Sequence, residues 1–249
     1  MNNPLLGILG GLGPMSGIYF CETLTAHTRA ERDSEHISFL LSSRADTPDR
    51  SSFIMGRSAE DPAPVMVQEA KRLQAAGATL LAIPCNTAHY FYSRICEAVD
   101  IPIINIIDET ARYCKHRGFS KVGVLATEGT AASGAYSRIF APHGIEIEPL
   151  TAREQGVITH IIFDCIKSGR PYDSDEFMRV AHALTERGCQ TLILGCTELS
   201  LIKRGGGLPG YFTDSLELLA LAAIRQWQRE PIGFDQPLMQ YYLDTLQES

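Results

Sequence analysis

Short apolar runs alternate with longer amphipathic segments along the whole chain. The runs have the length of buried strands, which we expect at residues 5–9, 37–41, 79–83, 103–107, 122–126, 145–148 and 191–194. Helical patterns cover residues 16–27, 64–76, 88–99, 132–140, 154–167, 173–186, 216–228 and 241–246. This alternation predicts parallel sheets with helices on both faces. In such folds, ligands bind beyond the carboxyl ends of the strands.

The sequence also contains an internal repeat. Residues 77–87 (GATLLAIPCNT) parallel residues 188–198 (GCQTLILGCTE), and in both a cysteine follows the first glycine by eight residues. Residues 7–13 (GILGGLG) and 123–129 (GVLATEG) match as well, and the two matches occur in the same order.

The repeat predicts an α/β fold of two pseudo-symmetric, doubly wound parallel-sheet (Rossmann-like) domains, with the active site in the cleft between them. We expect the first domain to span 1–108 plus 211–249, and the second to span 109–210.

The two cysteines of the repeat are the candidate catalytic residues. Under pseudo-twofold symmetry, Cys85 and Cys196 would approach one ligand from opposite sides. Each stands where a strand turns into a helix, and helix-terminal N–H groups lower a thiol pKa. One thiolate could remove a Cα proton while the opposite thiol returns one, which is what stereoinversion requires. A single buried free cysteine is more often a core residue, and we interpret the other five cysteines in that way.

Composition excludes several other classes of function. The net charge of -7 and the absence of Lys/Arg runs argue against nucleic acid or an anionic membrane as the partner. We find no signal peptide, no membrane-spanning segment and no Cys/His metal spacing, and therefore expect a cytoplasmic protein with free thiols and no bound metal.

Five motifs that span nearly the whole chain resemble the aspartate/glutamate racemase family, and most closely its aspartate racemase branch. They are residues 10–15 (GGLGPM), 47–50 (TPDR), 84–89 (PCNTAH), 125–130 (LATEGT) and 195–199 (GCTEL). The resemblance implies an isomerase with two catalytic cysteines at Cys85 and Cys196, no cofactor, and a homodimer. The glutamate branch instead has Asp-Ser-Gly after its first strand and Gly-Cys-Thr-His at its second cysteine.

The resemblance also implies that Arg50 and Lys167 hold the carboxylates of a small acidic amino acid. Burying a dicarboxylate requires cationic partners. From the residues alone, an arginine in such a segment is more often a solvated loop residue, and Lys167 equally fits a cation near a helix C-terminus.

Further candidate residues flank these motifs. Hydroxyl and amide groups that could bind a carboxylate are Asn86, Thr87, Thr127, Thr130 and Thr197, although the pair at 127 and 130 could simply form a turn. Met15 either lines the pocket or packs in the core. His89 fits a structural histidine and could instead tune the thiolate. Glu198 either assists Cys196 or caps a helix.

Three alternatives stay open. A dinucleotide-binding oxidoreductase would need G-x-G-x-x-G, but Ser16 stands at the last glycine. The same scaffold could carry hydantoin racemase or maleate isomerase-like chemistry. It could also serve as an amino-acid-binding regulator without catalysis. Aspartate and glutamate both remain candidate substrates.

Overall fold

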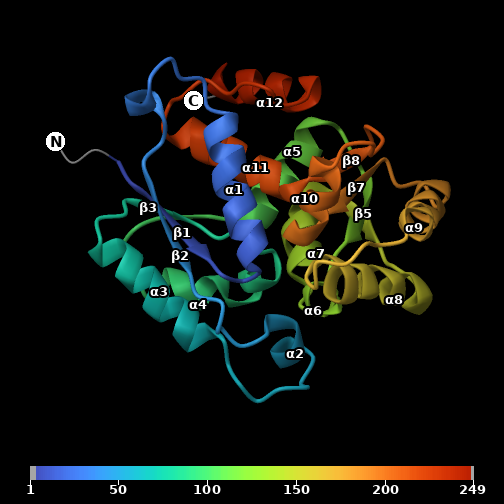
Figure 1. The fold of residues 1–249 in the computed structure, drawn as a ribbon. Helices are drawn as coiled ribbons and strands as arrows, with labels where there is room; N and C mark the ends of the chain where they lie inside the picture. Colours follow the sequence, from blue (N-terminus) through green and yellow to red (C-terminus); the bar gives the residue numbers. More distant parts are fainter. Residues whose placement is uncertain (1–3, 248–249) are drawn as a thin grey trace.

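Two sheets of four parallel strands lie side by side in the computed structural model, which describes residues 4–247 (Figure 1). The first sheet has the order β2-β1-β3-β4, and the second has the equivalent order β6-β5-β7-β8. The strands are β1 (Leu6–Gly10), β2 (Phe39–Ser43), β3 (Leu80–Ala82), β4 (Ile103–Ile104), β5 (Lys121–Leu125), β6 (Glu146–Glu148), β7 (Thr191–Leu194) and β8 (Phe212–Asp214). The predicted fold class is confirmed.

Helices connect successive strands and cover the sheets. Around the first sheet they are α1 (Pro14–Ala26), η1 (Asp33–Glu35), α2 (Arg50–Ile54), α3 (Ala63–Ala75), η2 (Thr87–Phe91), α4 (Tyr92–Cys96) and α5 (Ile106–His116). Around the second they are α6 (Glu128–Ala132), α7 (Ala135–Phe140), η3 (Ala141–His143), α8 (Ala152–His160), η4 (Ile161–Ile166), α9 (Ser174–Glu186) and α10 (Thr197–Arg204). The chain ends with α11 (Ser215–Gln226) and α12 (Gln236–Gln247).

The sequence repeat has a direct structural counterpart in two glycines. Gly7 pairs with Leu81 across β1 and β3, and Gly123 pairs with Leu192 across β5 and β7. A Cβ on Gly7 would lie 2.5 Å from the Leu81 side chain, and a Cβ on Gly123 would lie 2.8 Å from that of Leu192. Both glycines therefore leave room for the leucine of the neighbouring strand, and the two sheets solve the same packing problem in the same way.

One hydrophobic cluster joins the two halves. It contains residues of both sheets, among them Ile8 and Val122, together with the buried faces of α5 and α11. Helix α11 packs against α1, α5, α10 and β4, and Figure 1 shows it between the two sheets. Strands β3 and β7, which lead to the two cysteines, therefore both contribute residues to a shared core. The domain bounds of 1–108 plus 211–249 and 109–210 stay a prediction; strand β8, at residues 212–214, pairs with β7 of the second sheet.

Three segments differ from the predicted elements. The strand predicted at 103–107 ends at Ile104, because the Asn105 side chain accepts hydrogen bonds from the N–H groups of Ile107 and Asp108 and so caps α5. The helix predicted at 132–140 begins only at Ala135, because Gly134, with φ 63°, separates α7 from the end of α6 at Ala132. The helix predicted at 88–99 begins as a 3₁₀ segment, η2, before α4. Within residues 4–247, no helix is both long and apolar enough to span a membrane.

Candidate active site

Cys85 and Cys196 lie at equivalent positions just beyond β3 and β7, and both line one small cavity of about 10 Å³. Each side chain is almost fully buried, with 6% and 5% of its surface exposed. The residues after them, Thr87 from the first half and Thr197 from the second, line the same cavity. The structure therefore brings the two predicted cysteines to one space, as the repeat indicated.

The Cys85 segment is anchored by His89. The His89 Nε2 atom accepts the N–H of Ile106 over 3.2 Å, so its Nδ1 carries the proton and donates to the Cys85 carbonyl oxygen over 2.9 Å. Full burial lowers the pKa of His89 to about 4, which keeps the ring neutral. His89 thus ties the cysteine backbone to the start of α5. The Cys85 thiol itself contacts the Leu12 carbonyl oxygen at 3.5 Å.

Cys196 is the N-cap residue of α10, and its thiol donates a hydrogen bond to Oε2 of Glu198 over 2.9 Å. Burial raises the pKa of the Cys196 thiol well above its usual value, and the Glu198 carboxylate raises it further. Lys167 acts in the opposite direction. Cys196 is therefore a protonated thiol, which can give a proton but cannot take one.

Lys167 immediately follows η4, a π-helical segment that continues α8. The wider turn changes the direction in which the following side chains leave the helix, and such turns are frequent at functional sites. The Lys167 ammonium lies 3.5 Å from Oε1 of Glu198 and 4.7 Å from the centre of the Phe163 ring. Burial is the largest influence on the pKa of Lys167 and lowers it, but Glu198 and the other nearby acidic groups together raise it more, so the net shift is upward. Lys167 is therefore a firmly charged cation.

Arg50, the first residue of α2, is also buried, with 7% of its surface exposed. Its guanidinium donates hydrogen bonds to the carbonyl oxygens of Leu12, Thr47 and Pro48. Its Nε atom finds no acceptor in the described part of the chain. A buried donor without a partner is costly, so an incoming anion would be strongly favoured here.

Hydroxyl groups of the first half form hydrogen bonds with hydroxyl groups of the second half beside the small cavity. Thr87, Thr127 and Thr130 form a triangle of Oγ1–Oγ1 distances between 2.8 and 3.1 Å, and Ser51 donates to Thr127. Thr127 also caps α6 by accepting the N–H of Thr130. Thr127 lines the small cavity, whereas Thr130 lines a different one, beside β5 and β6.

Asn86 is held from both ends. Its Oδ1 accepts the Tyr136 hydroxyl over 2.8 Å, and its Nδ2 donates to Ser215 over 3.0 Å. The Ser215 hydroxyl in turn donates to the Leu194 carbonyl oxygen at the end of β7. Both polar atoms of the Asn86 amide thus hold the Cys85 segment against the second half.

A larger cavity of about 630 Å³ lies outside the small one. Met15, predicted to line the pocket, stands on its wall with 53% of its surface exposed. The two cavities share four lining residues, Asp49, Arg50, Lys167 and Glu198. These charged side chains therefore separate the open cavity from the space between the cysteines.

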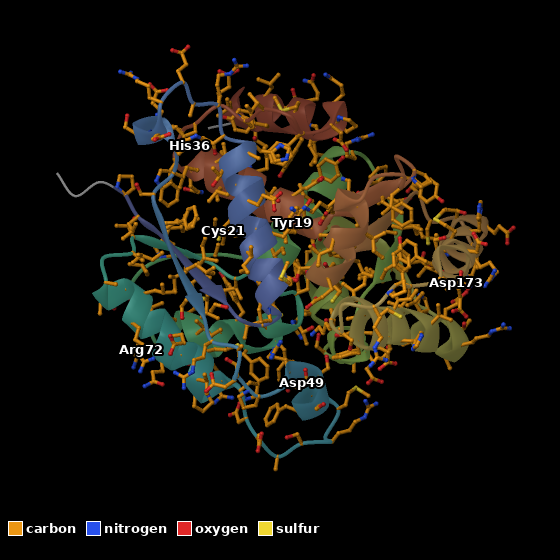
Figure 2. The ribbon with its side chains drawn as sticks, viewed as in Figure 1. Tyr19, Cys21, His36, Asp49, Arg72 and Asp173 are labelled. Atoms are coloured by element: carbon orange, nitrogen blue, oxygen red, sulfur yellow. The ribbon has the colours of Figure 1, made fainter. Side chains whose placement is uncertain are left out.

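Asp49 was not identified from the sequence as a site residue. It is the N-cap of α2, with its Oδ1 accepting the N–H of Ser52, and Figure 2 labels it beside that helix. Its place directly before Arg50 in residues 47–50 was the available signal. Within residues 4–247, no cluster of three His, Cys, Asp or Glu side chains is arranged to hold a metal ion.

Comparison with known proteins gives one consistent family. The family model described as Asp/Glu/Hydantoin racemase matches residues 9–207. The broad specificity amino-acid racemase RacX of Bacillus subtilis (strain 168) is 24% identical over 204 residues, covering 80% of this chain and 87% of that protein. A glutamate racemase of Corynebacterium kroppenstedtii is 33% identical over 136 residues, covering 52% and 45%. The solved structure of Picrophilus torridus aspartate racemase superposes with a TM-score of 0.77 at 27% identity, covering 92% of this chain and 96% of that one.

Proposed function

Because the chain belongs to the Asp/Glu/hydantoin racemase family, we propose that it is a cofactor-independent amino-acid racemase that interconverts L- and D-aspartate. Glutamate is the second candidate substrate. The observation that carries the proposal is the single cavity lined by both Cys85 and Cys196, with Arg50 and Lys167 beside it. The aspartate racemase that superposes on most of the chain supports the choice of aspartate.

In the proposed reaction, one cysteine thiolate takes the Cα proton and becomes a thiol. The opposite thiol gives its proton to the other face of the carbanion and becomes a thiolate. The reverse reaction exchanges the two roles, so no proton is gained or lost over the inversion. Burial and Glu198 raise the pKa of Cys196, which favours this thiol as the group that gives its proton. We assign the first proton abstraction to the opposite cysteine, Cys85.

Arg50 and Lys167 supply the positive charge that a buried dicarboxylate requires. An ion pair with the α-carboxylate also favours ionisation of the neighbouring Cα–H, because it partly neutralises the charge that the carbanion must bear. Thr87, Thr127 and Thr197 line the cavity. The Thr197 hydroxyl donates its hydrogen to the Pro84 carbonyl oxygen, so the proposal assigns to Thr87 and Thr127 the hydroxyl contacts with the same carboxylates. These roles extend the sequence predictions. The homodimer stays a prediction.

The substrate must displace the side chains that separate the two cavities. A space of about 10 Å³ is no larger than one water-sized sphere and cannot hold an amino acid. We therefore place substrate entry in the larger cavity, followed by movement of Arg50, Lys167 and Glu198 around the ligand. Enclosure after binding would exclude water from the carbanion.

Incubation with L-aspartate in D2O tests the proposal. A racemase exchanges the Cα proton for deuterium, seen as loss of the Cα–H signal in proton NMR, while the optical rotation falls to zero. The assay is run on protein pretreated with hydroxylamine and dialysed, which removes any pyridoxal phosphate. Retention of Cα protons in both enantiomers of aspartate and glutamate would contradict the proposal. Activity that depended on added pyridoxal phosphate would contradict the two-cysteine mechanism.

A further inference from the structure

The candidate site contains two buried polar atoms of opposite character without hydrogen-bond partners. Arg50 Nε is a donor that lacks an acceptor, and Glu198 Oε1 is an acceptor that lacks a donor. Both residues line both cavities. A ligand that completes this site must bring an anionic acceptor and a cationic or neutral donor, and a zwitterionic amino acid brings both.

We propose that Glu198 accepts the α-ammonium group of the substrate, and that the site thereby selects amino acids over otherwise identical acids that lack the amino group. The inference deepens the proposed function and rests on it for the choice of aspartate as ligand. It assigns to Glu198 a contact with the substrate, in addition to its contact with Cys196.

The charges of the site fit this assignment. Arg50 and Lys167 are its cations, and Asp49 and Glu198 are its anions. An aspartate ligand carries two carboxylates and one ammonium group. Two cations can receive the carboxylates, and the ammonium then requires an acceptor of opposite charge inside the same enclosure.

Of the two acids, Glu198 is the buried one, and its Oε1 accepts no hydrogen bond. Asp49 uses Oδ1 to cap α2 and is only half-buried, whereas Glu198 is 5% exposed. The second oxygen of Glu198, Oε2, accepts the Cys196 thiol. Lys167 lies 3.5 Å from Oε1 without a hydrogen bond to it, which makes an ion pair that an incoming ammonium can replace.

Gly13 provides the room for this carboxylate. A Cβ at position 13 would overlap Glu198 Oε1, so any other residue there would push the carboxylate away. Gly13 and Glu198 also both line the larger cavity, the side from which the substrate enters in our proposal. The carboxylate is therefore positioned between the entrance and Cys196.

Binding of the ammonium has a consequence for Cys196. The negative charge of Glu198 is one of the causes that raise the pKa of this thiol. An ammonium group on Glu198 offsets that charge and frees Lys167 for a substrate carboxylate. The ammonium group thus takes over from Lys167 the offsetting of the Glu198 charge beside Cys196.

Isothermal titration calorimetry with two ligands tests the inference. Racemic aspartate is one ligand, chosen so that turnover produces no net reaction, and succinate, which is aspartate without its amino group, is the other. The wild type should bind aspartate about 10-fold or more tightly than succinate. In Glu198→Gln the affinity for aspartate should fall about 10-fold or more, while that for succinate stays the same or improves.

Two further variants make the result decisive. Glu198→Asp keeps the charge and should keep part of the preference for aspartate. Glu69→Gln removes another buried glutamate, 5% exposed and paired with Arg44 and Arg72 away from the cysteines, and should leave the preference unchanged. Equal losses for aspartate and succinate in Glu198→Gln would overturn the inference, as would a wild type without preference for aspartate. Absence of Cα exchange with the binding preference intact would overturn the proposed racemisation but leave the role of Glu198 standing.

Discussion

The Thr197 hydroxyl donates a hydrogen bond to the Pro84 carbonyl oxygen over 3.1 Å. Thr197 follows one cysteine and Pro84 precedes the other, so the two cysteine segments are tied together directly. The bond is buried and crosses between the two halves of the molecule. The relative position of the thiols therefore depends on this contact as well as on the shared core.

Replacing Thr197 by valine should lower the free energy of unfolding by about 1–3 kcal/mol, because the buried Pro84 carbonyl then has no partner. Racemisation should decrease as well, since one of the contacts that fix the spacing of the thiols is lost. Thr197→Ser keeps the hydroxyl and serves as the control. Urea unfolding followed by circular dichroism measures the first effect. Equal stabilities of the valine and serine variants would show that this bond contributes nothing.

Cys85→Ala and Cys196→Ala should each reduce racemisation of aspartate by about 100-fold or more, since each removes one of the two proton-transfer groups. The loss should appear in kcat, measured by circular dichroism with either enantiomer. Cys21→Ala changes a half-buried thiol in α1, away from the site, and should retain normal activity. Full activity in either of the first two variants would refute the two-base mechanism.

Lys167→Gln should raise the KM for aspartate by about 10-fold or more, because a charge-assisted contact to a carboxylate is lost. Lys115→Gln removes an exposed lysine at the end of α5 and is the matched control. Initial rates over a range of aspartate concentrations separate KM from kcat. An unchanged KM would mean that Lys167 does not hold the substrate.

The protein should lose stability as the pH falls from about 6.5 to 4, in part because of His89. Burial lowers the pKa of His89 to about 4, below that of a histidine in an unfolded chain, so the unfolded state binds more protons over this interval. The contribution of His89 to the free energy of unfolding is fully present above pH 6.5, is lost as the pH falls to 4, and amounts to about 3 kcal/mol. His89→Gln should flatten the plot of unfolding free energy against pH, whereas the exposed-site variant His182→Gln should not. Parallel plots for wild type and His89→Gln would disprove this assignment.

Gly129→Ala should weaken aspartate binding. A Cβ on Gly129 would lie 2.6 Å from the Ser51 Cα, so α2 and its Arg50 must move away from α6. Gly156→Ala in α8 is the matched control, because its Cβ would meet nothing within 4 Å. We expect a higher KM in Gly129→Ala alone. If both variants bind aspartate like the wild type, the approach of α2 to α6 is not required.

Much of the architecture was accessible from the sequence, because apolar runs and the repeat report directly on buried strands. Strand β7 occurs at the predicted residues, Thr191–Leu194. Strand β8 was missed, since Phe212–Asp214 is too short to give a pattern. Helix α5 was missed for a different reason. Ile106 and Ile107 extend the apolar run of β4, and only the hydrogen bonds of the Asn105 side chain separate strand from helix.

The sequence predicted which residues belong to the site better than it predicted the contacts between them. Equivalent strand ends brought Cys85 and Cys196 together, a result of topology that the repeat encodes. The contact of Lys167 with Glu198 depends on the π-helical turn of η4, and no local residue pattern specifies such a turn. The sequence placed Thr130 with the substrate ligands, whereas its hydroxyl bonds to Thr87 and Thr127.

The two cysteines occupy equivalent positions but have unequal neighbours: Asn86, locked by Tyr136 and Ser215, follows one, and Thr197 and then Glu198 follow the other. Enantiomers have equal free energies in water, so racemisation must end at a 1:1 mixture. If aspartate is the substrate, as we propose, the ratio kcat/KM must then be identical for its L- and D-enantiomers, however asymmetric the protein is. The unequal neighbours of the two cysteines can therefore change kcat and KM only by the same factor. The enantiomer with the lower KM must also have the lower kcat.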